Sequence, residues 1–249
     1  MRIIPRIDIK NNYVIKGINF EGLRKVGDPI NFAKKYYNDG ADEIIYVDCV
    51  ASLYGQNNLA EITVNSTKDI FIPFCVGGGI RSIEDATSLF KNGADKVTVN
   101  TAAIENKSLI EQLSNKFGSQ SIVLSVEAKK ISKNKWQVYK NFGRDQTEID
   151  VIEWVEKASK AGAGEILLTS IESEGLGIGY DIGLYQECEK VVNIPIIACG
   201  GFGKLDHIKE LKDNTNIDAI ALSQALHYEK INLKEIKQYC IKNKINVRN

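Results

Sequence analysis

The sequence predicts an α/β fold, a closed barrel of parallel strands with a helix after each strand. Three observations lead to this prediction. Short apolar segments of strand length, rich in Ile and Val, alternate with amphipathic segments of helix length along all 249 residues. Several strand segments are apolar at consecutive positions, as in strands buried on both faces. Motifs also recur about half a chain length apart, which predicts two-fold pseudo-symmetry between two half-barrels.

Eight strands and eight helices are expected. The strand segments are residues 2–9, 43–49, 71–76, 95–100, 121–127, 165–170, 194–199 and 217–222. The helix segments lie near residues 28–39, 58–68, 82–93, 106–117, 149–161, 181–192, 204–213 and 231–243. Alternation of this kind gives parallel strands with right-handed crossovers, and the count of eight favours a (β/α)8 TIM barrel over an open sheet.

The half-barrel repeat is visible in the letters themselves. The segment GADEII at 40–45 recurs as GAGEIL at 162–167, and Gly78-Gly79 recurs at the same offset as Gly200-Gly201. No linker or low-complexity tract divides the chain, so a single domain over residues 1–249 is expected. A polar segment near 129–146 interrupts the alternation of strands and helices. It should form a small hairpin on the face that carries functional loops.

The composition excludes several classes of protein. The chain has 32 Lys and Arg against 32 Asp and Glu, so its net charge of zero argues against a dedicated nucleic-acid binder. It has no apolar run of about 18 residues to span a membrane, and its charged start is not a secretory signal. Five scattered cysteines without a CxxC pair indicate reduced thiols in a cytoplasmic protein. With only two histidines, no metal site and no cofactor is expected.

Glycine-rich turns follow the third and seventh strands, and each leads into a helix. Glycine lets backbone N–H groups turn outward and an oxyanion approach closely, and a helix N-terminus adds a favourable dipole. Tight strand-to-helix turns are the alternative, but two turns related by the repeat favour phosphate binding. We therefore expect an elongated substrate with a phosphate at each end. The first cradle would comprise Gly78, Gly79, Asn100 and Thr101, and the second Gly200, Gly201, Ser223 and Gln224.

Two carboxylates end opposite strands of the expected barrel. Asp8 ends the first strand and Glu127 the fifth, so both face the central mouth, where such a pair suits general acid–base catalysis. Because a buried charge is costly unless it is paired, each carboxylate could instead simply pair with a nearby lysine. Other polar groups near strand ends that could contact substrate are Lys16, in the loop after strand one, and Asp48, Thr169 and Glu174.

A second set of charges begins strands at the opposite face. Arg2, Glu43, Lys96 and Glu165 could close a ring of two cations and two anions at the barrel bottom. The residues alone favour a cluster that stabilises the fold, as charges at this face usually do.

The chain resembles the cyclase subunit of imidazole glycerol phosphate synthase over nearly its full length. The matching segments occur in order and include RIIPRIDIKNNYVIKGINF, FIPFCVGGGIRSIEDA, GADKVTVNTAAIEN, GAGEILLTS and IPIIACGG. The resemblance implies a barrel bound as a heterodimer to a glutamine amidotransferase subunit, whose ammonia passes through the barrel to a bis-phosphorylated substrate. It implies an ammonia gate at Arg2, Glu43, Lys96 and Glu165, and partner docking at Asp95 and Gln120.

The same resemblance implies an ammonia-dependent lyase of histidine biosynthesis. Two aspartates of the family perform the acid–base steps, and Asp8 matches the first while Glu127 replaces the second. Other departures gather at the mouth: Arg6 replaces a small residue, Val50 a threonine, and Asn141-Phe142-Gly143 a glycine pair. Glu174-Gly175-Leu176 replaces Asp-Gly-Thr in the substrate-binding loop of strand six.

Three functions are compatible with this pattern. The full-length match favours the cyclase of histidine biosynthesis. The departures at the mouth leave open a paralogue that delivers glutamine-derived ammonia for the amidation of a bacterial surface sugar. The third is a catalytically silent barrel that only activates the glutaminase.

Overall fold

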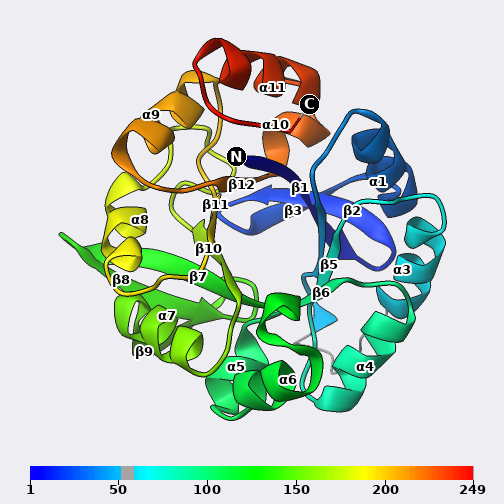
Figure 1. Cartoon of the computed structure of the whole chain (residues 1–249), viewed down its shortest axis with the longest axis vertical. Helices are drawn as coiled ribbons and strands as arrows, with labels where there is room; N and C mark the ends of the chain where they lie inside the picture. Colours follow the sequence, from blue (N-terminus) through cyan, green and yellow to red (C-terminus); the bar gives the residue numbers. More distant parts are fainter. Residues whose placement is uncertain (52–58, 249) are drawn as a thin grey trace.

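Eight parallel strands close into a barrel, which confirms the predicted fold class. The computed structural model describes residues 1–51 and 59–248. The barrel strands are β1 (Arg2–Lys10), β4 (Ile44–Asp48), β5 (Phe74–Gly77), β6 (Lys96–Val99), β7 (Ile122–Ser132), β10 (Glu165–Ser170), β11 (Ile196–Cys199) and β12 (Ala219–Leu222). Pairing of β12 with β1 and of β7 with β10 completes the ring, and helices surround it (Figure 1).

The helices follow the strands as expected. The long ones are α1 (Pro29–Asn38), α3 (Leu59–Thr67), α4 (Ile83–Lys91), α6 (Leu109–Phe117), α7 (Val151–Lys160), α8 (Ile182–Glu189), α9 (Asp206–Asn214) and α11 (Leu233–Lys242). Residue 58, the expected start of the second helix, lies outside the described residues. Short helices α5 (Thr101–Glu105) and α10 (Gln224–His227) and the 3-10 turn Ser119–Ser121 were not expected.

Side-chain caps mark where several of the helices begin. Asp28 accepts a hydrogen bond from the backbone N–H of Asn31 at the start of α1. Ser82 and Asp85 form a reciprocal capping box at the start of α4. Such caps satisfy backbone donors that the first helical turn leaves without partners.

Three strands begin two or three residues later than the sequence predicts. Strand 71–76 was wrong at its start because β5 begins at Phe74, after Pro73, and Phe71 is 81% exposed. Strand 194–199 likewise begins at Ile196, after Pro195, since proline has no N–H to donate to the ladder. Strand 217–222 begins at Ala219, and Ile217 packs in the core outside the ladder.

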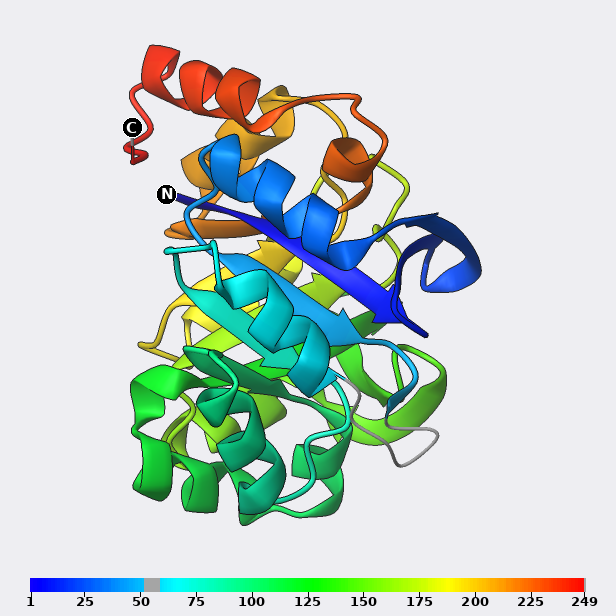
Figure 2. The ribbon, with the colours of Figure 1, turned by 90° about the vertical axis from the view of Figure 1, so that its right-hand side faces the viewer.

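Two antiparallel β-sheet extensions project from the barrel at its mouth. After β1, strands β2 (Tyr13–Ile18) and β3 (Glu21–Gly27) form a hairpin where the sequence predicted only a loop. After β7, strands β8 (Lys135–Lys140) and β9 (Asp145–Asp150) form an antiparallel sheet with the end of β7. The two extensions follow the first and fifth barrel strands, β1 and β7. Figure 2 shows the β2–β3 hairpin at the end opposite to both chain termini.

Two of the apolar clusters lie on the two sides of the barrel wall. The larger lies between strands and helices, and the smaller fills the barrel interior with side chains such as Ile4, Ile45, Val123 and Leu167. Alternation along β1 separates them, because Ile3 and Ile7 face outward while Ile4 faces inward. In the described part of the chain, no helix is both long enough and apolar enough to cross a membrane.

Candidate functional site

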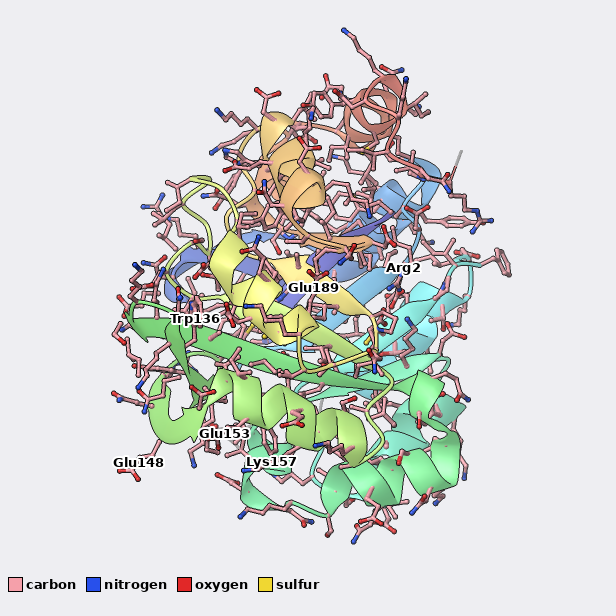
Figure 3. All side chains as sticks on the ribbon, turned by 60° about the vertical axis from the view of Figure 1, so that its left-hand side comes forward. Arg2, Trp136, Glu148, Glu153, Lys157 and Glu189 are labelled. Carbon is pink, nitrogen blue, oxygen red and sulfur yellow. The ribbon has the colours of Figure 1, made fainter. Side chains whose placement is uncertain are left out.

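A ring of four charges closes the lower end of the barrel. Arg2 Nη1 lies 2.8 Å from Glu43 Oε2, and Arg2 also pairs with Glu165. Lys96 Nζ lies 3.0 Å from Glu43 Oε2 and 2.8 Å from Glu165 Oε2. Burial raises the pKa of Glu43 despite these two cations, and nearby Glu165 adds to the effect. The structure thus brings together all four residues of the predicted gate. Figure 3 shows one of them, Arg2, at the end away from Trp136 of β8.

The inward-facing residues of β1 define the layers above this ring. Successive inward positions are Arg2 in the ring, Ile4 in the apolar layer, Arg6 above it and Asp8 at the mouth. Arg6 is only 1% exposed. Its Nη1 donates to Thr169 Oγ1 on β10 at 3.0 Å and reaches Cys199 Sγ on β11 at 3.6 Å. The guanidinium therefore crosses the barrel interior between the ring and the mouth.

Asp8 is held between two cations. Its Oδ1 accepts a hydrogen bond from Arg6 Nε at 2.9 Å, and its Oδ2 lies 3.7 Å from Lys16 Nζ. Lys16 lies on β2, not in a loop as the sequence predicted, and it also pairs with Glu174. All four side chains are buried, and the two basic and two acidic groups are paired with one another. Pairing of Asp8 with a lysine, one of the two possibilities left open by the sequence, is observed.

Glu127 has a different environment on the opposite strand, β7. Its Oε2 accepts a hydrogen bond from the backbone N–H of Gly143 at 2.8 Å, and the side chain is buried. Burial raises the pKa of Glu127 to about 7, although this hydrogen bond and the charge of Arg6 oppose the change. A carboxyl group with a pKa near 7 is suited to donate and accept protons at neutral pH.

The first glycine turn opens into the same cavity as Glu127. The cavity has a volume of about 150 Å³, and its lining includes the four residues of the first predicted cradle. Gly78 requires its glycine because its φ is +104° and a Cβ would lie 2.4 Å from the Asp48 carbonyl oxygen. Asp48 also lines the cavity, and it accepts hydrogen bonds from the backbone N–H groups of Val50 and Ala51, both at 2.9 Å. Burial raises the pKa of Asp48.

The second glycine turn is covered by the loop that follows β10. The N–H of Gly179 donates to the carbonyl oxygen of Gly201 at 2.8 Å, and a Cβ on Gly201 would lie 1.9 Å from the oxygen of Gly179. Gly175, in the same loop, adopts φ +76° against the β2–β3 hairpin. Ser223 donates its hydroxyl to the carbonyl oxygen of Arg6 at 2.7 Å, and Gln224 begins α10. The two cradles therefore differ, because only the first is among the lining of the cavity that contains Glu127.

Two aromatic side chains near the site were missed by the sequence analysis. Phe20 and Phe142 pack with ring centroids 4.3 Å apart, and the Arg6 guanidinium lies 5.4 Å and 5.8 Å from the two rings. They belong to an apolar cluster over the mouth with Ile15, Cys49, Tyr139 and Ile171. The departure Asn141-Phe142-Gly143 was the signal in the sequence that could have identified this cover.

Asp95 and Gln120 lie near the charged ring, on the outside of the barrel. Asp95 precedes β6, is exposed and accepts a hydrogen bond from the N–H of Phe74 at 2.8 Å. Gln120 precedes β7 and is also exposed. Both are therefore accessible at the lower end.

Comparison with known proteins places the chain in a family. Residues 2–232 match the model of a family described as histidine biosynthesis protein. The chain is 45% identical over 237 residues to the imidazole glycerol phosphate synthase subunit HisF of Bacillus cereus (strain G9842), covering 95% of the chain and 94% of that protein. It is 52% identical over 206 residues to the subunit of the same name from Legionella pneumophila, covering 83% of the chain and 97% of that protein.

A third relative of the same name, from Dehalococcoides mccartyi, is 43% identical over 238 residues, which are 96% of this chain and 94% of that protein. These matches bear out the predicted resemblance and do not favour the sugar-amidating alternative. The chain belongs to the histidine biosynthesis protein family, among relatives named imidazole glycerol phosphate synthase subunit HisF.

Proposed function

We propose that the chain is the cyclase subunit of imidazole glycerol phosphate synthase. In the proposed reaction, ammonia and the phosphoribulosyl-formimino carboxamide nucleotide give imidazole glycerol phosphate and aminoimidazole carboxamide ribonucleotide. The family match over nearly the whole chain supports this reaction. The substrate is elongated and carries a phosphate at each end, as the two glycine turns suggest.

The proposal rests on the different environments of the two carboxyl groups at the mouth, those of Asp8 and Glu127. Glu127 is buried in the cavity and has a pKa of about 7, whereas Asp8 contacts the cations Arg6 and Lys16. Paired carboxyl groups in unlike environments can divide the roles of acid and base. Glu127 would exchange protons with the substrate near neutral pH, and Asp8 would act as the carboxylate partner on the opposite strand.

The charged ring would admit the ammonia. In this proposal a glutaminase subunit docks at the lower end, near Asp95 and Gln120, and forms a heterodimer with this chain in the cytoplasm. Opening of the ring formed by Arg2, Glu43, Lys96 and Glu165 would let a small neutral molecule enter the barrel. The molecule must then pass Arg6, whose guanidinium crosses the interior.

Turnover with ammonium salt tests the cyclase directly. The purified chain is given the nucleotide substrate and saturating ammonium, and imidazole glycerol phosphate is measured. We expect product from the natural chain and none from Glu127→Ala, whereas the exposed Glu148→Ala variant should match the natural chain. No product from the natural chain would reject the proposal. Stimulation of a glutaminase without any product would instead indicate the silent-barrel function.

A further inference from the structure

The two glycine turns are related by the sequence repeat, but they have different surroundings. The turn at Gly78 and Gly79 lines the cavity of about 150 Å³. Within residues 1–51 and 59–248, Thr98 Oγ1 and Asn100 Oδ1 are buried without a hydrogen-bond partner, and both residues line this cavity. Buried polar atoms without partners are rare in proteins, so this turn is suited to a polar ligand.

The carboxylate of Glu174 lies against the second glycine turn, at Gly200. Glu174 Oε2 lies 3.4 Å from the position of a Cβ on Gly200, so the carboxylate sits against the turn. Its other oxygen, Oε1, pairs with Lys16 Nζ, and the side chains of Lys16 and Glu174 are only 3% and 5% exposed. A glycine turn together with a buried ammonium group resembles the environment that proteins provide for a ligand oxyanion.

The charge balance of this half of the mouth depends on Glu174. Lys16 has one close carboxylate in Glu174 and a more distant one in Asp8, at 3.7 Å, which is itself shared with Arg6. Burial lowers the pKa of Lys16, but Glu174 and Asp8 outweigh that effect and raise it. Without Glu174, two buried cations would face the single carboxylate of Asp8.

We propose that the Glu174 carboxylate occupies the second anion-binding site of the mouth, at the Gly200 turn. A ligand phosphate would have to compete with it for this site. A doubly phosphorylated ligand binds first through the Gly78–Gly79 turn, and its second phosphate binds at Gly200 only when the Glu174 carboxylate leaves Lys16. Glu174 therefore lowers the affinity of the mouth for the second phosphate and so sets how tightly a doubly phosphorylated ligand binds. The inference deepens the proposed function and rests on it for the identity of the doubly phosphorylated ligand.

Inorganic phosphate tests the competition without any turnover. Equilibrium dialysis with labelled phosphate should give one bound phosphate per natural chain and two per Glu174→Ala chain. Glu172→Ala, a change of an exposed carboxylate in the same loop, should still bind one. Two phosphates of similar affinity on the natural chain, or only one on Glu174→Ala, would overturn the proposal. Lys16→Met in the Glu174→Ala chain should return the count to one, and retention of two phosphates would also refute it.

A second variant guards against misfolding of Glu174→Ala. Glu174→Gln removes the charge but keeps the shape and a hydrogen-bonding group for Lys16. Its melting temperature should rise with added phosphate more than that of the natural chain, because a ligand stabilises the state that binds it. Equal rises in the two proteins would count against the proposal.

The doubly phosphorylated substrate provides the affinity measurement. If Glu174 occupies the second anion-binding site in more than about nine-tenths of molecules, its removal should tighten substrate binding about tenfold or more. Substrate dissociation constants, measured without ammonia, should show this change for Glu174→Ala and none for Glu172→Ala. Failure of turnover in every variant, with the phosphate counts as expected, would reject the proposed reaction and leave this inference standing.

Discussion

At the scale of single residues, Glu127 links stability to pH. Its pKa is about 7 in the folded chain against an ordinary value of 4.5, so between these values the folded state binds more protons than the unfolded state. The contribution of Glu127 to the free energy of unfolding is therefore greatest below pH 4.5, and it disappears as the pH rises through 7. The shift corresponds to about 3 kcal/mol at most.

Replacement of Glu127 isolates this contribution. We compare the free energies of unfolding of the natural chain and of Glu127→Gln. The value for the natural chain minus that for the variant should be larger at pH 5 than at pH 8 by about 2–3 kcal/mol. Urea denaturation at both pH values measures it. Glu148→Gln is the control, since this exposed side chain points away from the barrel in Figure 3, and its difference should not change with pH. A Glu127→Gln difference that is constant with pH would contradict the assignment.

Arg6 is a second residue whose effect can be measured. Arg6→Met should lower the free energy of unfolding by about 3–5 kcal/mol, because it leaves buried Asp8 with only the contact to Lys16 at 3.7 Å. Arg6→Met combined with Asp8→Leu should recover a large part of that loss, since no unpaired carboxylate then remains. Urea denaturation of both variants checks this. Arg24→Met at an exposed position should change little, and additive losses in the double variant would argue against a coupled pair.

The sequence identified individual residues of the site better than their partners. Strand ends predicted that Asp8 and Glu127 face the mouth, because side-chain alternation along a buried strand is regular. Nothing local predicted that Lys16 meets Glu174, 158 positions away along the chain. That contact depends on how β2 leans over the loop after β10, and such long-range geometry has no signature in spacing or composition.

At the scale of elements, the barrel strands were predictable and the β2–β3 hairpin was not. Barrel strands are buried on both faces and therefore read as apolar runs, whereas β3 is mostly exposed and polar. The turn between β2 and β3 is Asn19-Phe20, with φ of 49° and 64°. Both residues adopt the left-handed conformation of a two-residue hairpin turn, but Phe is rarely used there, so the usual Asn-Gly signal is missing.

Phe20 should hold this hairpin over the mouth. Its ring packs on Phe142 and on the Arg6 guanidinium, so Phe20→Ala should lower the free energy of unfolding by about 3 kcal/mol. Hydrogen exchange should become faster in the amides of β2 and β3, while those of the barrel strands stay protected. Phe71→Ala, at a position 81% exposed, is the matched control and should leave exchange unchanged. Unaltered exchange of the hairpin in Phe20→Ala would show that other contacts hold it.

At the scale of the whole molecule, the two ends of the barrel carry different sets of groups, and we propose separate roles for them. The lower end carries the ring of Arg2, Glu43, Lys96 and Glu165, with Asp95 and Gln120 exposed beside it. The upper end carries both glycine turns and both mouth carboxylates. Because the barrel wall and its apolar interior lie between them, a substitution at the lower surface should affect delivery of ammonia without changing the chemistry at the mouth.

Asp95→Asn tests that separation. The amide oxygen can still accept the hydrogen bond from the N–H of Phe74, so only the charge at the lower surface is lost. Binding of the glutaminase subunit, measured by titration calorimetry, should weaken about tenfold, which corresponds to about 1.4 kcal/mol. Product formation with ammonium salt should stay unchanged. Glu148→Gln, at an exposed position on β9, should alter neither quantity. If Asp95→Asn instead bound the partner normally and slowed the ammonium reaction, the two ends would be coupled and the docking surface would lie elsewhere.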